Sequence, residues 1–314
     1  MVKRVAAIDC GTNSVRLLIA DVGPSTFAEV TRQMRIVRLG EGVDRTGRLS
    51  GAAIERTRVA LVDYAAEIAA AGVDAARMVA TSASRDAANF LDFEQMVTAV
   101  LGFAPEVITG DEEARLSFTG AVRGLTAEPP FLVVDIGGGS TEFVLGSTAV
   151  DAALSVDIGC VRMTERHLRD DPPTAPQIAA AEADITAAVD RALAAVDGTR
   201  ARTLVGLAGS VTTVTALALG LPAYDPAAIH RARISAADVA KVTGELLAAT
   251  TGQRLASPVM HPGRADVIGA GALILRVIME RSGAGSVIAS ESDILDGIAL
   301  LLATSAASRR RFAS

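Results

Sequence analysis

The stretch Phe131-Leu-Val-Val-Asp-Ile-Gly-Gly-Gly-Ser-Thr-Glu142 decides the fold of this chain. Its apolar residues are rich in β-branched side chains, which predicts a buried strand ending in the carboxylate of Asp135. The three glycines that follow allow a tight turn and bring backbone N–H groups close to an anion. Ser140 and Thr141 add hydroxyl groups, and Glu142 adds a second carboxylate. The segment predicts a phosphate-binding loop with a divalent cation between carboxylates and phosphate oxygens. A plain glycine-rich β-hairpin is the alternative.

A second copy of this pattern stands near the N-terminus, in Val5-Ala-Ala-Ile-Asp-Cys-Gly-Thr-Asn-Ser14. Aligning Asp9 with Asp135 also brings a glycine and a serine of the two segments into register. Each copy has an apolar strand before it and a second apolar segment after it. Such self-similarity predicts two related halves that face each other.

A third segment, Leu204-Val-Gly-Leu-Ala-Gly-Ser210, predicts another strand that runs into a glycine-serine turn and then a helix. The start of that helix offers a second place where backbone N–H groups can meet an anion. Elsewhere, apolar strands alternate with segments of helical spacing, such as Ser50–Ala71 and Thr174–Val196. This alternation predicts an α/β fold with a mixed sheet.

The loops and the glycine-serine turn together resemble those of the actin-like ATPase superfamily, which includes sugar and acetate kinases and heat-shock chaperones. More specifically, the sequence resembles the exopolyphosphatase and guanosine pentaphosphate phosphohydrolase family. The segments that carry this resemblance are Asp9–Ser14, Thr81–Asn89, Thr109–Leu116, Asp135–Glu142 and Pro262–Gly271. The resemblance implies two actin-like (ribonuclease H-like) domains with mixed sheets flanked by helices, and an active site in the interdomain cleft.

The same resemblance implies an exopolyphosphatase, a metal-dependent hydrolase that removes terminal phosphate from inorganic polyphosphate. Guanosine pentaphosphate is the alternative substrate, because it also ends in a phosphoanhydride. A kinase or motor-type ATPase of the same superfamily shares the loops and is a second alternative. A non-catalytic sensor that binds polyphosphate or an alarmone is a third.

Carboxylates of both loops are expected to hold the metal. Asp9, Asp135 and Glu142 suit Mg²⁺, with Mn²⁺ as an alternative, because Mg²⁺ takes one or two carboxylates and keeps several waters. For Asp9, a hydrogen bond within its own loop is the other interpretation. The expected substrate contacts, besides Arg85, are Asn13, Ser14, Gly137, Gly138, Gly139, Ser140, Thr141, Gly209 and Ser210.

Two neighbouring glutamates compete for the role of general base. Thr109-Gly-Asp-Glu112 has the spacing of a capping box, which gives Glu112 a structural role at a helix start. Glu113 lies about 100° further round that helix. In the family pattern the glutamate directly before Ala-Arg-Leu is the proposed base, so the resemblance assigns this role to Glu113. Glu112, or a metal-bound hydroxide without a protein base, remains the alternative.

Arg85 follows a predicted buried strand and matches the family's substrate-binding arginine. A guanidinium there can bind a phosphate through two hydrogen bonds. A surface ion pair with Asp86 or Asp92 is the alternative. Asn89, four residues further on, shares the helical face of Arg85 and is expected either to orient substrate or to cap.

The length of 314 residues suits two domains, predicted as 1–126 and 127–314. A closing helix at about 294–305 is expected, by analogy with the superfamily, to pack back on the first domain. The basic segment Ser308–Phe312 is expected to be a solvated tail.

The amino-acid composition limits which partners and which cellular compartment are expected for this protein. Only 3% of residues are aromatic and the net charge is −6, so nucleic acid is not an expected partner. No membrane-spanning run and no secretory signal is predicted. Two cysteines do not make a disulfide framework, which favours a cytoplasmic protein. The family resemblance further implies a homodimer.

Overall fold

The structure, a computed structural model, describes residues 1–304 of the chain. Two compact units are present. The first comprises Met1–Gly120 and the returning segment Ile294–Thr304, and the second comprises Ala121–Asp293. Each unit has its own mixed sheet and its own hydrophobic core. The sequence placed the break slightly later, after residue 126, and the basic segment 308–312 lies outside the described residues.

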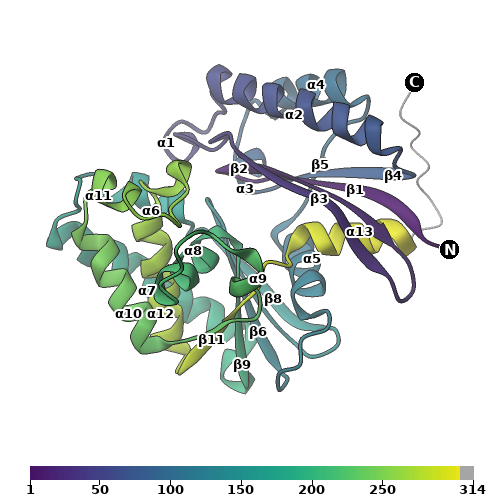
Figure 1. Ribbon diagram of the computed structural model, residues 1–314. Coiled ribbons are helices and arrows are strands. Elements are labelled where there is room, and N and C mark those ends of the chain that lie inside the picture. The colour runs from purple at the N-terminus through teal and green to yellow at the C-terminus, as the bar shows by residue number, and fades with distance from the viewer. Residues whose placement is uncertain (305–314) are drawn as a thin grey trace. The chain divides into compact units, whose positions relative to one another are not determined.

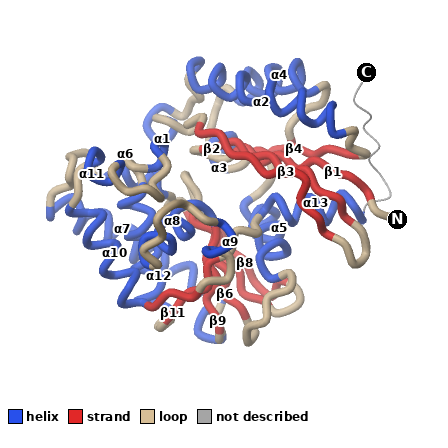
Figure 2. The backbone as a smooth tube through the Cα atoms, in the orientation of Figure 1, coloured by secondary structure: helices blue, strands red, loops and turns tan. Residues whose placement is uncertain are grey.

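A five-stranded sheet in the order β3-β2-β1-β4-β5 forms the centre of the first unit (Figures 1 and 2). β1 pairs antiparallel with β2 and parallel with β4, so the sheet is mixed. The strands are β1 (Lys3–Cys10), β2 (Ser14–Val22), β3 (Phe27–Ile36), β4 (Ala75–Ala80) and β5 (Glu106–Val107). β1 and β2 are the two arms of the hairpin that carries the first glycine loop.

Helices cover both faces of this sheet (Figure 1). The helices of the unit are α1 (Val43–Thr46), α2 (Gly51–Ala71), α3 (Ser82–Arg85), α4 (Phe90–Leu101), most of α5 (Gly110–Val122) and α13 (Ile294–Thr304). One face packs on α2 and α4 through residues such as Ile8 and Leu17. The opposite face packs on α13 through Ala7 and Leu18. Because side chains alternate along a strand, Asp9 lies on the α13 side.

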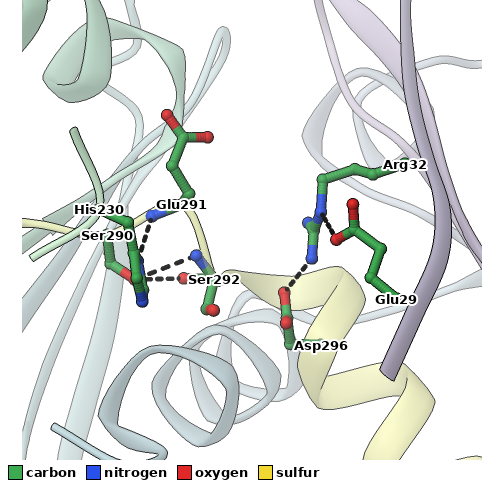
Figure 3. A network of polar contacts seen from close by, with 7 residues as sticks. All are labelled: Glu29, Arg32, His230, Ser290, Glu291, Ser292 and Asp296. Carbon is green, nitrogen blue, oxygen red and sulfur yellow. Dashed lines mark hydrogen bonds and ion pairs between the residues drawn. The ribbon is translucent and has the colours of Figure 1, made fainter. Parts of the chain in front are cut away.

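An ion-pair network ties α13 to the edge strand β3. Arg32 donates to Glu29 on its own strand at 2.8 Å and to Asp296 on α13 at 2.9 Å (Figure 3). Asp296 is buried, whereas Arg32 is partly exposed. The pair joins residues that lie 264 positions apart in the sequence. It contributes, with the apolar contacts of α13, to holding this helix on the first unit.

The second unit contains a six-stranded sheet in the order β10-β11-β9-β6-β7-β8 (Figure 1). β6 pairs antiparallel with β7 and parallel with β9, so this sheet is also mixed. The strands are β6 (Phe131–Ile136), β7 (Thr141–Gly146), β8 (Val150–Val156), β9 (Thr203–Leu207), β10 (Arg233–Ser235) and β11 (Ser286–Ala289). β6 and β7 are the arms of the second glycine loop, which repeats the plan of β1 and β2.

One face of this sheet packs on a layer of helices in which α7 and α12 are the longest. The helices are α6 (Cys160–His167), α7 (Ala175–Val196), α8 (Ala208–Ala218), α9 (Pro226–Ile229), α10 (Ala236–Ala248), α11 (Thr251–Leu255) and α12 (Ile268–Ser282), with 3₁₀ turns at Gly198–Arg200 and Pro262–Arg264. Leu132, Val134 and Phe143 point into this core. By alternation, Asp135 and Glu142 lie on the opposite face.

The chain between β11 and α13 is held by short polar contacts. The backbone amide of Glu291 donates to Nδ1 of His230 at 3.2 Å. The Ser290 hydroxyl donates to the carbonyl of Ser292 at 2.8 Å (Figure 3). These bonds satisfy polar groups where the strand ends.

The long elements were predicted from the sequence, and several short ones were missed. α6, α9, α11 and β10 each have eight residues or fewer, which is too short for a clear periodic pattern. α1 is a helix of only four residues, flanked by Gly42 and Gly47. No helix among residues 1–304 is both long and apolar enough to cross a membrane.

Candidate active site

The two glycine loops have the same closing hydrogen bond. In the first unit the amide of Gly11 donates to the carbonyl of Ser14 at 3.0 Å, and in the second the amide of Gly137 donates to Ser140 at 3.0 Å. In both, the next-to-last residue of the first strand is an aspartate, and it faces a residue of the second strand. The repeat seen in the sequence is therefore a repeat of local backbone geometry.

The carbonyls of the second loop are bound by the start of α6. Cys160 donates its amide to Gly137, and Val161 and Arg162 donate theirs to Gly138 at 2.9 and 3.1 Å. The amides of Gly138 and Gly139 donate to no other residue in the described part of the chain. The loop therefore presents N–H groups while its carbonyls are turned to the protein, which is the arrangement that an anion requires.

This arrangement depends on a glycine that the sequence analysis did not select. A Cβ on Gly159 would overlap the backbone of Gly138 and Gly139. Only a glycine allows α6 to begin so close to the loop. Gly159 stands between an isoleucine and a cysteine in Ile158-Gly-Cys160, and nothing in that local pattern signals a long-range approach.

Asp135 and Glu142 are directly opposed residues of β6 and β7, and both are buried. Directly opposed side chains lie on the same sheet face with Cβ atoms roughly 5 Å apart, and like charges in this position are destabilising. Oε1 of Glu142 accepts hydrogen bonds from the hydroxyls of Ser140 and Ser155, each at 2.8 Å. The Thr141 hydroxyl donates to the carbonyl of Ile158. The hydroxyls of Ser140 and Thr141, which were predicted to contact substrate, thus donate hydrogen bonds to other groups of the protein.

Two buried carboxylates on one face are hard oxygen donors, and Mg²⁺ commonly takes one or two such ligands together with water. Among residues 1–304, no group of three or more histidine, cysteine, aspartate or glutamate side chains is arranged to hold a metal ion. A pair of carboxylates that leaves the remaining positions to water suits Mg²⁺, which keeps several waters when bound. Asp135 and Glu142 fit the cation on this ground.

In the first loop, the aspartate faces an arginine instead of a glutamate. Asp9 faces Arg16 across β1 and β2, and Arg16 donates to Oδ2 of Asp9 through Nε at 3.0 Å and Nη2 at 2.6 Å. The carbonyls of Asn13 and Ser14 also hold protein amides, namely those of Val37, Arg38 and Gly11. Asp9 forms an ion pair with a cross-strand arginine, an interpretation that the sequence analysis did not consider.

Glu113 and Arg85 contact each other. Nη1 of Arg85 donates to Oε2 of Glu113 at 2.8 Å and to the carbonyl of Ile108 at 3.0 Å. The Nε and Nη2 edge of Arg85 donates to no residue among those described. The predicted base Glu113 and the predicted phosphate ligand Arg85 are therefore in direct contact. The second edge of the guanidinium can still donate two hydrogen bonds to a phosphate. The alternative ion pairs of Arg85 with Asp86 or Asp92 are not formed.

Glu112 has a different environment. The amide of Glu112 donates to the Thr109 hydroxyl at 3.2 Å, which is one half of the predicted capping box. Its carboxylate forms an ion pair with Nη2 of Arg77 at 2.7 Å. The side chain of Asn89 accepts a hydrogen bond from the amide of Leu49 at 2.8 Å and donates one to the carbonyl of Leu49 at 3.1 Å. These two bonds connect the loop at Leu49 to the start of α4. Glu112 and Asn89 thus have structural roles.

Gly209 and Ser210 lie in the first turn of α8, which begins directly after β9. Ala208 has a positive φ of 67°, which is strained for a residue with a side chain. The guanidinium of Arg264 lies directly over Gly209, where a Cβ would overlap it. Arg264 forms no ion pair with a described residue, so a positive charge stands at the start of α8. The Ser210 side chain packs against Gly271 and is buried.

The chain belongs to the Ppx/GppA phosphatase family, whose pattern matches residues 18–304. It is 53% identical to exopolyphosphatase 2 of Mycobacterium tuberculosis, over 96% of this chain and 98% of that protein. The crystal structure of an exopolyphosphatase-like protein superimposes with a TM-score of 0.93 at 45% identity, covering 96% of this chain and 98% of that one. The PPX-GPPA enzyme of Aquifex aeolicus gives a TM-score of 0.81 at 31% identity, covering 96% and 100% of the two chains. The predicted family is confirmed, and so is the predicted α/β class with two mixed sheets flanked by helices.

Proposed function

We propose that this protein is an exopolyphosphatase that removes terminal orthophosphate from inorganic polyphosphate with water as the acceptor. The observation that carries the proposal is the second glycine loop, where amides of Gly138 and Gly139 that bond none of residues 1–304 adjoin the buried carboxylates of Asp135 and Glu142. The relation to a protein named exopolyphosphatase 2 supports the choice of polyphosphate.

In this proposal the loop amides hold phosphate oxygens of the substrate. The Nε and Nη2 edge of Arg85 matches two oxygens of one phosphate, which is the geometry that a guanidinium favours. Arg264, lying over Gly209, adds a further positive charge for a polyanion. Gripping and neutralising the phosphate chain is most of what catalysis of phosphoryl transfer requires.

Asp135 and Glu142, with Asp9 as a further candidate, would hold Mg²⁺, and Mn²⁺ is the alternative. When bound, such an ion neutralises charge that develops on phosphate oxygens. Asp9 also forms an ion pair with Arg16. Asp135 and Glu142 form the pair whose mutual repulsion a cation would relieve.

Glu113 is the proposed general base. Its carboxylate takes a proton from water, the water oxygen bonds the terminal phosphorus, and the bond to the bridging oxygen breaks. Orthophosphate and a polyphosphate shortened by one unit are the products. The contact with Arg85 supports this role, because it places the carboxylate beside the guanidinium that is proposed to bind the phosphate. Water is activated most effectively by a group held within hydrogen-bond reach.

Guanosine pentaphosphate hydrolysis is the alternative activity within the family, and phosphoryl transfer to a small acceptor is the alternative in the wider superfamily. A substrate panel distinguishes them. The purified protein is incubated with Mg²⁺ and either polyphosphate, guanosine pentaphosphate or labelled ATP with candidate acceptors, and phosphate release is measured. Phosphate release from polyphosphate with the highest kcat/KM supports the proposal. Acceptor phosphorylation without release from polyphosphate overturns it.

We also propose a homodimer in the cytoplasm, as the family resemblance implies. Both cysteines, Cys10 and Cys160, are buried free thiols, which agrees with a reducing compartment. Sedimentation equilibrium of the full chain measures the oligomeric state, and a monomer at micromolar concentration would contradict the dimer.

A further inference from the structure

A cavity of about 240 Å³ lies within the second unit. Its mouth is formed by the exposed residues Arg169, Asp170 and Asp171, which follow α6. Its inner wall is formed by Arg254 of α11 and by Gly269, near the start of α12. The proposed active site uses none of these residues.

Arg254 is the unusual member of this wall, because its side chain is buried although it is charged. Nε donates to the carbonyl of Leu246 at 2.8 Å, and Nη1 donates to the carbonyl of Ala265 at 3.0 Å. Nη2 lies 3.5 Å from the place where a Cβ on Gly269 would stand. Nη2 donates to no described residue, and the guanidinium forms no ion pair with one.

A buried charge costs free energy unless it is paired and hydrogen-bonded. Burial lowers the pKa of Arg254, and the charges of Asp171 and Asp266 partly oppose this at longer range. Asp171 does not serve as the missing partner, since both of its carboxylate oxygens accept from the Thr251 amide at 2.8 and 3.0 Å. The guanidinium is thus held in place by two backbone carbonyls with its third nitrogen directed at the cavity wall formed by Gly269.

We propose that this cavity binds a compact, singly charged oxyanion through Nη2 of Arg254. Its volume is below the roughly 300–1,000 Å³ of pockets for drug-sized ligands, so the ligand is small. Three aspartates and two arginines line the cavity, and this acidic excess disfavours a polyanion such as polyphosphate. A carboxylate or monobasic phosphate carries the single negative charge that matches the guanidinium of Arg254. This inference goes beyond the proposed function and does not rest on it.

Gly269→Ala tests the site without removing the arginine. The new methyl group would stand 3.5 Å from Nη2 and 3.3 Å from a terminal methyl of Leu247, which must move by a few tenths of an ångström. Alanine is also the better helix former, so α12 should be retained. Gly244→Ala is the matched control, because that glycine lies on an exposed face of α10 with nothing within 4 Å of an added Cβ.

The probes are sodium acetate and inorganic phosphate near pH 6, each titrated into the full-length protein and followed by NMR at the amides of Thr251 and Gly269. Saturable shifts are expected for the wild type and Gly244→Ala, with binding at least about tenfold weaker in Gly269→Ala. Saturation by acetate alone, by phosphate alone or by both identifies which oxyanion the site accepts. Absence of saturable shifts in the wild type with either probe overturns the inference.

Equal affinity of Gly269→Ala and the wild type for the bound probe also overturns the inference. Arg254→Lys provides a second variant, because it keeps the positive charge and loses the planar fork. Its melting curve is measured first, and binding at wild-type strength in the folded variant contradicts the role of Nη2. Phosphate bound in the proposed active site would not shift the amides of Thr251 and Gly269 in this variant-dependent way, so the two sites are distinguished.

Discussion

Replacing Glu113 by glutamine separates the role of its carboxylate in proton abstraction from its role in the structure. Oε2 of Glu113 accepts from Nη1 of Arg85 at 2.8 Å, and the two side chains are 12% and 23% exposed. Glutamine has the same shape, and its amide oxygen can accept the same hydrogen bond. It cannot take a proton from water, so only the base is removed.

The two effects differ in size. A hydrogen bond to a charged group contributes about 1.5–3 kcal/mol and a neutral one about 0.5–1.5 kcal/mol. We therefore expect Glu113→Gln to lower the free energy of unfolding by about 1 kcal/mol, a fall in Tm of roughly 2–4 °C. General-base catalysis contributes about 10²–10⁴ in rate, or about 2.7–5.5 kcal/mol in barrier height. We expect kcat to fall by that factor while KM changes little. The expected rise in the activation free energy is therefore larger than the expected loss in the free energy of unfolding.

The assay is steady-state phosphate release from polyphosphate at saturating Mg²⁺, with a melting curve for each variant. Glu112→Gln is the matched control. Its carboxylate is half exposed, and its partner Arg77 keeps a second ion pair with Glu106, so the loss in stability should stay below about 1 kcal/mol. Near-full kcat in Glu113→Gln would refute the assignment, as would a loss confined to Glu112→Gln. Equal losses in both variants, with lowered Tm, would indicate a folding defect.

Further outcomes follow from the same geometry. Asp135→Asn should shift the Mg²⁺ dependence of phosphate release to higher concentration, because it removes ligand charge, and an unchanged Mg²⁺ titration would argue against a metal at this pair. Gly159→Ala should raise KM for polyphosphate by about tenfold or more, because its Cβ would displace the loop at Gly138, whereas Gly285→Ala, which has open space, should leave KM unchanged. Burial raises the pKa of Asp184, but hydrogen bonds from His167 and Arg166 outweigh burial and leave that pKa below its usual value. The stability that Asp184 contributes should therefore be present above about pH 4 and be lost as the pH falls through its folded pKa, so the Tm difference from Asp184→Asn should vanish in acid; a difference that persists unchanged at pH 2–3 would contradict this.

The sequence by itself determined the local architecture. Apolar runs of β-branched residues marked β1, β2, β6 and β7, and the glycines between them marked both hairpins, because strand and turn preferences depend on a few adjacent residues. Helical spacing marked α2 and α7 for the same reason. The duplicated motif then predicted two related α/β units, and the two compact units with one mixed sheet each confirm that class.

Only the tertiary structure decided which groups meet. Arg85 and Glu113 stand 28 residues apart and become an ion pair because α3 follows β4 and α5 follows its neighbour β5. Strand register gives Asp9 an arginine partner and Asp135 a glutamate partner at equivalent positions of the two loops. Gly159 is required by a backbone approach from another segment, and Arg254 is buried by the packing of α11 and α12. These pairings depend on register and long-range packing, which local residue preferences do not encode.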